Sequence, residues 1–114
     1  MLGVFHPLRH RWGNFTFSEP GVKRCILNAA GSLMMMEVHF EEGAEGYEHS
    51  HPHEQMSYCL RGSFEFRIDG KKYKVSAGES IAIPPNAKHG VTTLEADSAL
   101  LDAFTPIRED LLKR

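Results

Sequence analysis

The sequence predicts one all-β domain, built as a sandwich or a barrel of short strands. Three observations favour this class: glycine and proline recur at short intervals, the runs between them are rich in β-branched and aromatic residues, and no long segment has helical periodicity. With 114 residues the chain is long enough for one domain with an apolar core, and it leaves no room for a second.

The composition narrows the function classes. Hydrophobic residues make up 41% of the chain and charged residues 25%, close to the averages for soluble globular proteins, so neither disorder nor a membrane span is expected. The formal charge of -2 supplies no basic field, and the cationic cluster Arg9-His10-Arg11 is too short for a nucleic-acid footprint. We therefore expect no nucleic-acid or membrane partner.

The N-terminal residues 1–20 are predicted to form an arm that covers a sheet edge, before a single barrel domain of residues 21–114. His6, Pro7 and several charges interrupt the start of the chain before a signal-peptide core develops, so we expect a cytoplasmic protein. Cys25 and Cys59 are isolated among apolar neighbours, which is more typical of buried thiols than of a disulfide or a nucleophile.

Eight strands are predicted, over residues 22–29, 33–40, 54–60, 64–68, 72–75, 80–83, 90–94 and 99–105. The run FEFRIDGKKYKV at residues 64–75 is typical of a hairpin with one buried face and an Asp-Gly turn. Pro84 and Pro85 lack the backbone donor that a central strand needs, so the chain must turn before His89. A short helical turn is predicted over residues 108–114.

A histidine cluster follows the second predicted strand, with His49, His51 and His53 within five positions. Alternate residues of a strand share a face, so His49, His51 and Gln55 would point to one side, as the ligands of a metal must. Imidazole is a common protein donor to transition metals. The alternative is a histidine-rich surface turn broken by Pro52, and the local pattern leaves both open.

Near the C-terminus, Asp102 shares a predicted strand face with Leu100 and Phe104. A carboxyl among such neighbours would have a raised pKa or a charged partner, and both situations are common at functional sites. The alternative is an edge-strand aspartate that faces water. Arg108 follows a proline break and could be a solvated residue at a helix start.

Two spaced motifs resemble those of the cupin superfamily. The first motif is Gly43, His49, His51, Gln55 and Gly62, and the second is Gly78, Pro84, Asn86 and His89. The resemblance implies a cupin barrel, a double-stranded β-helix or jelly roll, in which His49, His51, Gln55 and His89 hold one metal ion. It skips His53, and the parity of Glu54 places that residue outward.

Two positions depart from the cupin pattern. Gln55 stands where most cupins have glutamate, so the four neutral ligands would leave the charge of a divalent ion uncancelled and favour an anionic substrate. Asn86 stands where many have glycine, and asparagine tolerates the left-handed backbone that glycine would supply. The metal is expected to be nickel, zinc, manganese or iron.

A narrower resemblance joins EHSHPHEQ, FEFRIDG, AGESIAIPPNAKHG and the tail D-x-F-x-P-x-R-E-D. These segments are similar to the pectin-degradation (KdgF-like) cupins that open unsaturated uronate sugars. The resemblance implies that Asp102 is catalytic, that Phe104 and Arg108 bind the sugar acid, and that the protein is a metal-dependent ring-opening enzyme. It also implies a homodimer.

Two other function classes stay open on the sequence. A three-histidine site with an open face can also bind iron or copper and oxygen, as in a metal-dependent dioxygenase, although Gln55 and the acid in the tail argue mildly against it. A non-catalytic barrel that binds a sugar or another small molecule is the other alternative, because this fold hosts many unrelated activities.

Overall fold

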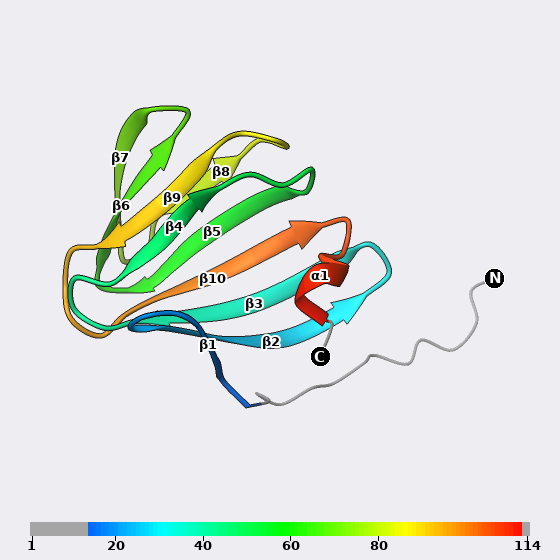
Figure 1. The fold of residues 1–114 in the computed structure, drawn as a ribbon, viewed down its shortest axis with the longest axis horizontal. Helices are drawn as coiled ribbons and strands as arrows, with labels where there is room; N and C mark the ends of the chain where they lie inside the picture. Colours follow the sequence, from blue (N-terminus) through cyan, green and yellow to red (C-terminus); the bar gives the residue numbers. More distant parts are fainter. Residues whose placement is uncertain (1–13, 113–114) are drawn as a thin grey trace.

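The computed structural model describes residues 14–112, which form two antiparallel β-sheets packed face to face (Figure 1). In chain order the elements are β1 (Thr16–Glu19), β2 (Val22–Ala30), β3 (Leu33–Phe40), β4 (Glu45–His49), β5 (Glu54–Arg61), β6 (Ser63–Ile68), β7 (Lys71–Ser76), β8 (Ser80–Ile83), β9 (His89–Thr93), β10 (Ser98–Thr105) and α1 (Glu109–Leu112). The predicted all-β class with a short C-terminal helical turn is confirmed.

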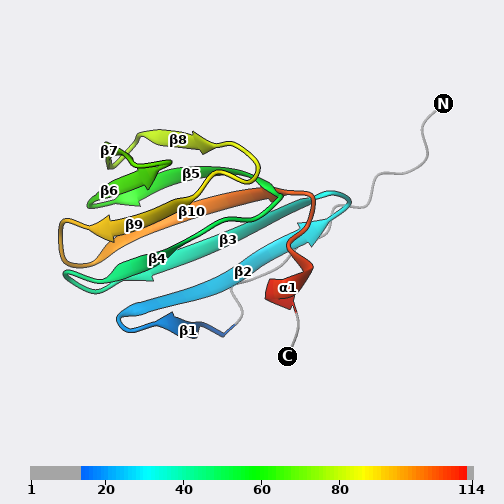
Figure 2. The same ribbon diagram turned by 45° about the horizontal axis from the view of Figure 1, so that its top comes forward.

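The chain passes repeatedly between the two sheets. The six-stranded sheet has the order β1-β2-β3-β10-β5-β8 and the four-stranded sheet the order β4-β9-β6-β7. Figure 2 shows β10 running along the middle of the larger sheet between β3 and β5. Because β10 is a central strand, the side chains on its inner face are covered by both neighbours and by the opposite sheet.

Alternation of apolar and polar residues places the core between the sheets. The β3 residues that face inward, from Met34 to Phe40, are buried together with Leu100 and Phe104 of β10. From the four-stranded sheet, Phe64 and Phe66 meet them, and the rings of Phe40 and Phe64 pack edge to face at 4.9 Å. Several of these core side chains, among them Phe40, Phe66 and Phe104, also line a cavity between the sheets.

All eight predicted strands are confirmed, each with ends within one residue of the prediction. Strand β4 was not predicted, because nearly all of its residues are exposed and their sequence EGYEH has no apolar alternation. Strand β1 lies within the predicted arm and forms the edge of the six-stranded sheet, paired with β2, while residues 1–13 of that arm lie outside the described residues.

The predicted turns have the backbone that their residues favour. Asp69 and Gly70 both have positive φ, 48° and 83°, which is the pattern of a type I′ hairpin turn between β6 and β7. Strand β8 ends at Ile83, directly before the two prolines, and Asn86 adopts a left-handed φ of 67°. This turn brings His89 to the first position of β9.

Two further features concern the chain as a whole. Within residues 14–112, Cys25 and Cys59 are buried thiols that form no disulfide, as predicted. No helix among residues 14–112 is long and apolar enough to cross a membrane.

Candidate metal centre

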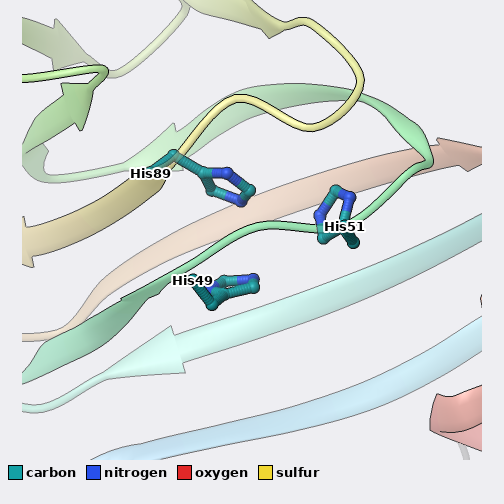
Figure 3. Close-up of side chains that lie close together, drawn as sticks. All are labelled: His49, His51 and His89. Carbon is teal, nitrogen blue, oxygen red and sulfur yellow. The ribbon is translucent and has the colours of Figure 1, made fainter.

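The side chains of three histidines lie close together (Figure 3). His49 is the last residue of β4 and His89 the first of β9, and the pairing of these two strands sets the two residues opposite each other. His51 comes from the segment between β4 and β5. The ligand nitrogens of the three imidazoles lie within 4.8 Å of one another, so the three side chains form a group that could hold one metal ion.

Each imidazole is oriented by a backbone carbonyl. The Nδ1 atoms of His49, His51 and His89 lie 2.9 Å, 3.0 Å and 2.9 Å from the carbonyl oxygens of residues 47, 53 and 87. A carbonyl oxygen only accepts hydrogen bonds, so Nδ1 must carry the proton in all three rings. In the neutral imidazole this leaves the lone pair on Nε2, and such carbonyl contacts are the usual support of metal-binding histidines.

Burial keeps two of the rings neutral. Desolvation lowers the pKa of His89 to about 4 and also lowers that of His51, with the positive charge of Arg108 acting in the same direction. The Nε2 atom of His89 is buried and has no hydrogen-bond partner among the described residues. An unpartnered lone pair of this kind, aimed at two other histidines, fits a bound cation.

Gln55 at the start of β5 completes the group. Its Oε1 atom lies 3.0 Å from His51 Nε2. With the His51 proton on Nδ1, both of these atoms are acceptors, so no hydrogen bond joins them in this arrangement. Two acceptor atoms at this distance can both bind one metal ion, because metal-nitrogen and metal-oxygen bonds are each about 2 Å long.

Asp102 lies on the inner face of β10, buried beside this cluster. The Ser57 hydroxyl donates a hydrogen bond of 2.6 Å to its Oδ1. Desolvation raises the pKa of Asp102 to about 6, against the opposing effects of Ser57, Arg108 and Arg24. The central place of β10 rules out the alternative of a solvated edge-strand aspartate.

Phe104 and Arg108 form the wall next to Asp102. The Phe104 ring is buried and meets His51 edge to face at 5.9 Å, and the Arg108 guanidinium lies 5.3 Å from the centre of the same ring. The Arg108 side chain is only 12% exposed, and its Nη2 donates a 2.7 Å hydrogen bond to Asp110. Arg108 is therefore held in the wall of the site by an ion pair rather than solvated.

One cavity joins the histidine cluster to the tail residues. It measures about 570 Å³ when its open mouth is included, and its lining contains His49, Gln55, His89, Asp102, Phe104, Arg108 and Arg24. Arg24 is a half-buried residue of β2, and no hydrogen bond or ion pair joins it to another described residue. The cavity is therefore lined by two guanidinium groups, by the buried carboxyl of Asp102 and by the partly buried carboxyl of Glu19.

The structure brings the predicted residues together but corrects one reason for it. His49 and His51 do not share a strand, because β4 ends at His49 and β5 begins at Glu54, so their convergence depends on the connecting turn and not on strand parity. Glu54 faces outward as expected, and His53 is not one of the three histidines whose ligand atoms converge.

Two residues of the site were not predicted. Ser57 has the same strand parity as Gln55, which is the signal that could have found it. The signal for Arg24 is a charged residue with the same strand parity as the apolar Val22 and Ile26 of β2.

Comparisons with known proteins agree with this geometry. Residues 36–104 match the model of the cupin domain family. The chain is 43% identical over 93 residues to the pectin degradation protein KdgF of Dickeya dadantii (strain 3937), which covers 81% of this chain and 84% of that protein.

Solved structures give the same assignment. KdgF from Halomonas sp. superposes with a TM-score of 0.82 at 36% identity, covering 87% of this chain and 91% of that chain. An RmlC-like cupin from Shewanella frigidimarina NCIMB 400 has a TM-score of 0.80 at 37% identity, covering 86% and 87% of the two chains. The chain therefore belongs to the cupin family, in the group of small cupins that includes the KdgF proteins.

Proposed function

We propose that this protein is a metal-dependent enzyme of pectin or alginate breakdown that opens 4,5-unsaturated uronate monosaccharides to linear keto acids without a redox step. The observation that carries the proposal is the 43% identity to the pectin degradation protein KdgF over most of both chains. The cavity supports it further, because the predicted catalytic and substrate-binding residues line the same space as His49 and His89.

The proposed metal site consists of His49, His51, His89 and Gln55, and the ion is a divalent nickel, zinc, manganese or iron. A bound divalent ion supplies Lewis-acid polarisation of a substrate oxygen, with a charge that these four neutral side chains do not cancel. The site then favours an anionic ligand such as a sugar acid.

Asp102 is the proposed proton carrier. Its carboxyl is buried, and a pKa of about 6 leaves it largely ionised at neutral pH yet easily protonated. The carboxylate takes the proton of the anomeric hydroxyl as the bond from C1 to the ring oxygen breaks, and the electron pair of that bond goes to the ring oxygen. The enolate formed at C4 and C5 then receives the proton at C4, which yields the ketone and the aldehyde of the linear acid with no change in oxidation level overall.

Phe104 and Arg108 are the proposed substrate-binding residues. Phe104 can contact the sugar where its ring lines the cavity, and Arg108 can donate to the sugar carboxylate. One edge of the Arg108 guanidinium already contacts Asp110, with Nη2 at 2.7 Å and Nε at 3.4 Å from the carboxylate oxygens. The contact with the substrate would then use the remaining N–H groups of this guanidinium.

The direct test is to load the purified protein with each of the four metals, add 4,5-unsaturated galacturonate, and follow the loss of ultraviolet absorbance of the conjugated double bond. We expect ring opening that depends on the metal. Asp102→Asn should lower kcat by about 100-fold to 10,000-fold, the usual contribution of a positioned acid or base, with no loss of bound metal.

Asp97→Asn is the matched control, because Asp97 is an exposed aspartate that pairs with Arg61 away from the cavity. It should turn over like the wild type. A metal-loaded wild-type protein that opens the ring no faster than buffer, or that consumes oxygen on a phenolic substrate instead, would contradict the proposal.

A further inference from the structure

Ser57 links the candidate metal site to the candidate catalytic residue. It lies in β5 with no exposed surface, directly opposite Asp102 in the pairing of β5 with β10. Its Oγ donates a 2.6 Å hydrogen bond to Asp102 and accepts a 3.0 Å hydrogen bond from Gln55 Nε2. A continuous chain of hydrogen bonds therefore runs from the Asp102 carboxylate to the Gln55 amide.

The donor and the acceptor of each of these hydrogen bonds follow from which groups carry protons. An ionised carboxylate only accepts, so the single hydroxyl proton of Ser57 goes to Asp102, and Ser57 must then accept from the Gln55 amino group. An amide that turns its amino group toward Ser57 turns its carbonyl oxygen the opposite way. That oxygen lies 3.0 Å from His51 Nε2, at the histidine cluster.

We propose that Ser57 is a positioning residue that ties the Asp102 carboxylate to the Gln55 amide and so turns the Gln55 carbonyl oxygen toward the metal ligands. The inference rests on the proposed function, since it takes Gln55 as a ligand and Asp102 as the proton carrier.

Ser57 matters because no other described side chain holds the Gln55 amide in this orientation. Within residues 14–112, the polar side-chain neighbours of the Gln55 amide are His51 and Ser57. Without the Ser57 hydroxyl, the amide can rotate and donate its N–H to the lone pair of His51. That rotation would remove the oxygen ligand and occupy the nitrogen ligand at the same time, so it should weaken metal binding.

The first test is the affinity of the metal-free protein for Zn²⁺, measured by competition with a chromophoric chelator. Ser57→Ala should raise the Kd by about 10-fold to 100-fold, the usual effect of losing a residue that supports a metal ligand. Ser63→Ala is the matched control, because Ser63 is also buried and donates a 2.7 Å hydrogen bond to a carboxylate, that of Glu95. It should bind Zn²⁺ as the wild type does.

The second test changes Asp102, which ends the series of hydrogen bonds on the side away from Gln55. Asp102→Ala removes the acceptor that fixes the Ser57 proton, so it should weaken Zn²⁺ binding although Asp102 is not a proposed ligand. Asp102→Asn keeps an oxygen that can accept from Ser57 and should retain the affinity. The double variant Ser57→Ala with Asp102→Ala should bind no more weakly than the weaker single variant, because both changes remove the same support.

These outcomes separate the inference from the proposed function. Wild-type Zn²⁺ affinity in both Ser57→Ala and Asp102→Ala would overturn the positioning role, and if Ser57→Ala does not fold, equal affinities of Asp102→Ala and Asp102→Asn would overturn it alone. The expected affinities without any ring opening would remove the proposed reaction and leave the positioning role in place. A wild type that binds no Zn²⁺ would overturn the inference.

Discussion

Burial removes the Asp102 carboxyl from water and disfavours its charged form. The free energy of unfolding of the protein should therefore depend on pH. The pKa of Asp102 rises from 3.8 to about 6 on folding, so between these values the folded state binds the proton more tightly than the unfolded state. The free energy of unfolding therefore falls as the pH rises from 4 to 6, and this contribution is constant above that window. The loss amounts to about 3 kcal/mol.

Asp102→Asn removes the charge and keeps an oxygen for Ser57. We expect the metal-free variant to be more stable than the metal-free wild type at pH 7.5, by as much as about 3 kcal/mol, with the gap closing toward pH 4. Urea unfolding at several pH values in the presence of a chelator measures this difference.

Asp110→Asn should have the opposite sign. The hydrogen bond from Arg108 lowers the pKa of Asp110, so the ionised form stabilises the fold above the ordinary pKa, and that stability is lost as the pH falls. This variant should be less stable than the wild type at pH 7.5. An Asp102→Asn variant with the same pH profile as the wild type would show that the Asp102 carboxyl is not desolvated.

Most site residues could be predicted one by one, but their contacts could not. Motif spacing identified His49, His51 and His89, and the strand face of Asp102 followed from its apolar neighbours. The pairing of Arg108 with Asp110 depends on the path of the chain after β10, which no periodicity encodes. The link from Ser57 to Asp102 needs the register of β5 with β10, which joins residues 45 positions apart.

At the scale of elements, the turn from β5 to β6 depends on a glycine with no room for a side chain. Gly62 has a φ of 79°, and a Cβ there would lie 1.9 Å from Ser98 Oγ and 3.0 Å from Ser98 Cα. Gly62→Ala therefore combines an unfavourable backbone with overpacking, and we expect it to cost about 2–4 kcal/mol of unfolding free energy.

Gly78 separates these two causes. It has a similar φ of 89°, but no atom lies within 4 Å of an added Cβ, so Gly78→Ala has the backbone penalty alone and should cost about 1 kcal/mol. Chemical denaturation of both variants gives the comparison. Equal losses would mean that Ser98 moves aside without cost.

Elements with a clear alternation or turn signal could be predicted from sequence, and the others could not. The hairpin of β6 and β7 combines alternating residues with an Asp-Gly turn. Strand β4 has neither, and it is held by its pairing with β9, which is a long-range contact. Strand β4 ends at His49, so a strand that the sequence pattern does not predict positions one of the three histidines.

For the whole molecule, the homodimer expected from the family resemblance stays a prediction. The outer face of the six-stranded sheet exposes Met56, Tyr58 and Leu60 of β5, with Leu101 of β10 beside Tyr58. A second copy of the chain packed on this face would bury these apolar groups. Tyr58→Glu should then shift the mass measured by light scattering from dimer to monomer.

Tyr73→Glu is the control for this experiment. Tyr73 is a residue of β7 in the other sheet, and it is 43% exposed, as is Tyr58. It should leave the mass unchanged. A wild type that is monomeric at all concentrations would contradict the prediction.

Because β10 lies between β3 and β5, the six-stranded sheet cannot be completed while the chain is still being synthesised. While a ribosome is still synthesising the chain, β3 and β5 have been completed but the strand that joins them has not, so each presents an open edge. Contacts between segments so far apart in sequence form slowly, and open edges invite association with other nascent chains. Translation that stops before residue 98 would therefore yield an aggregation-prone product. The cavity that Asp102 lines can form only after β10 has left the ribosome.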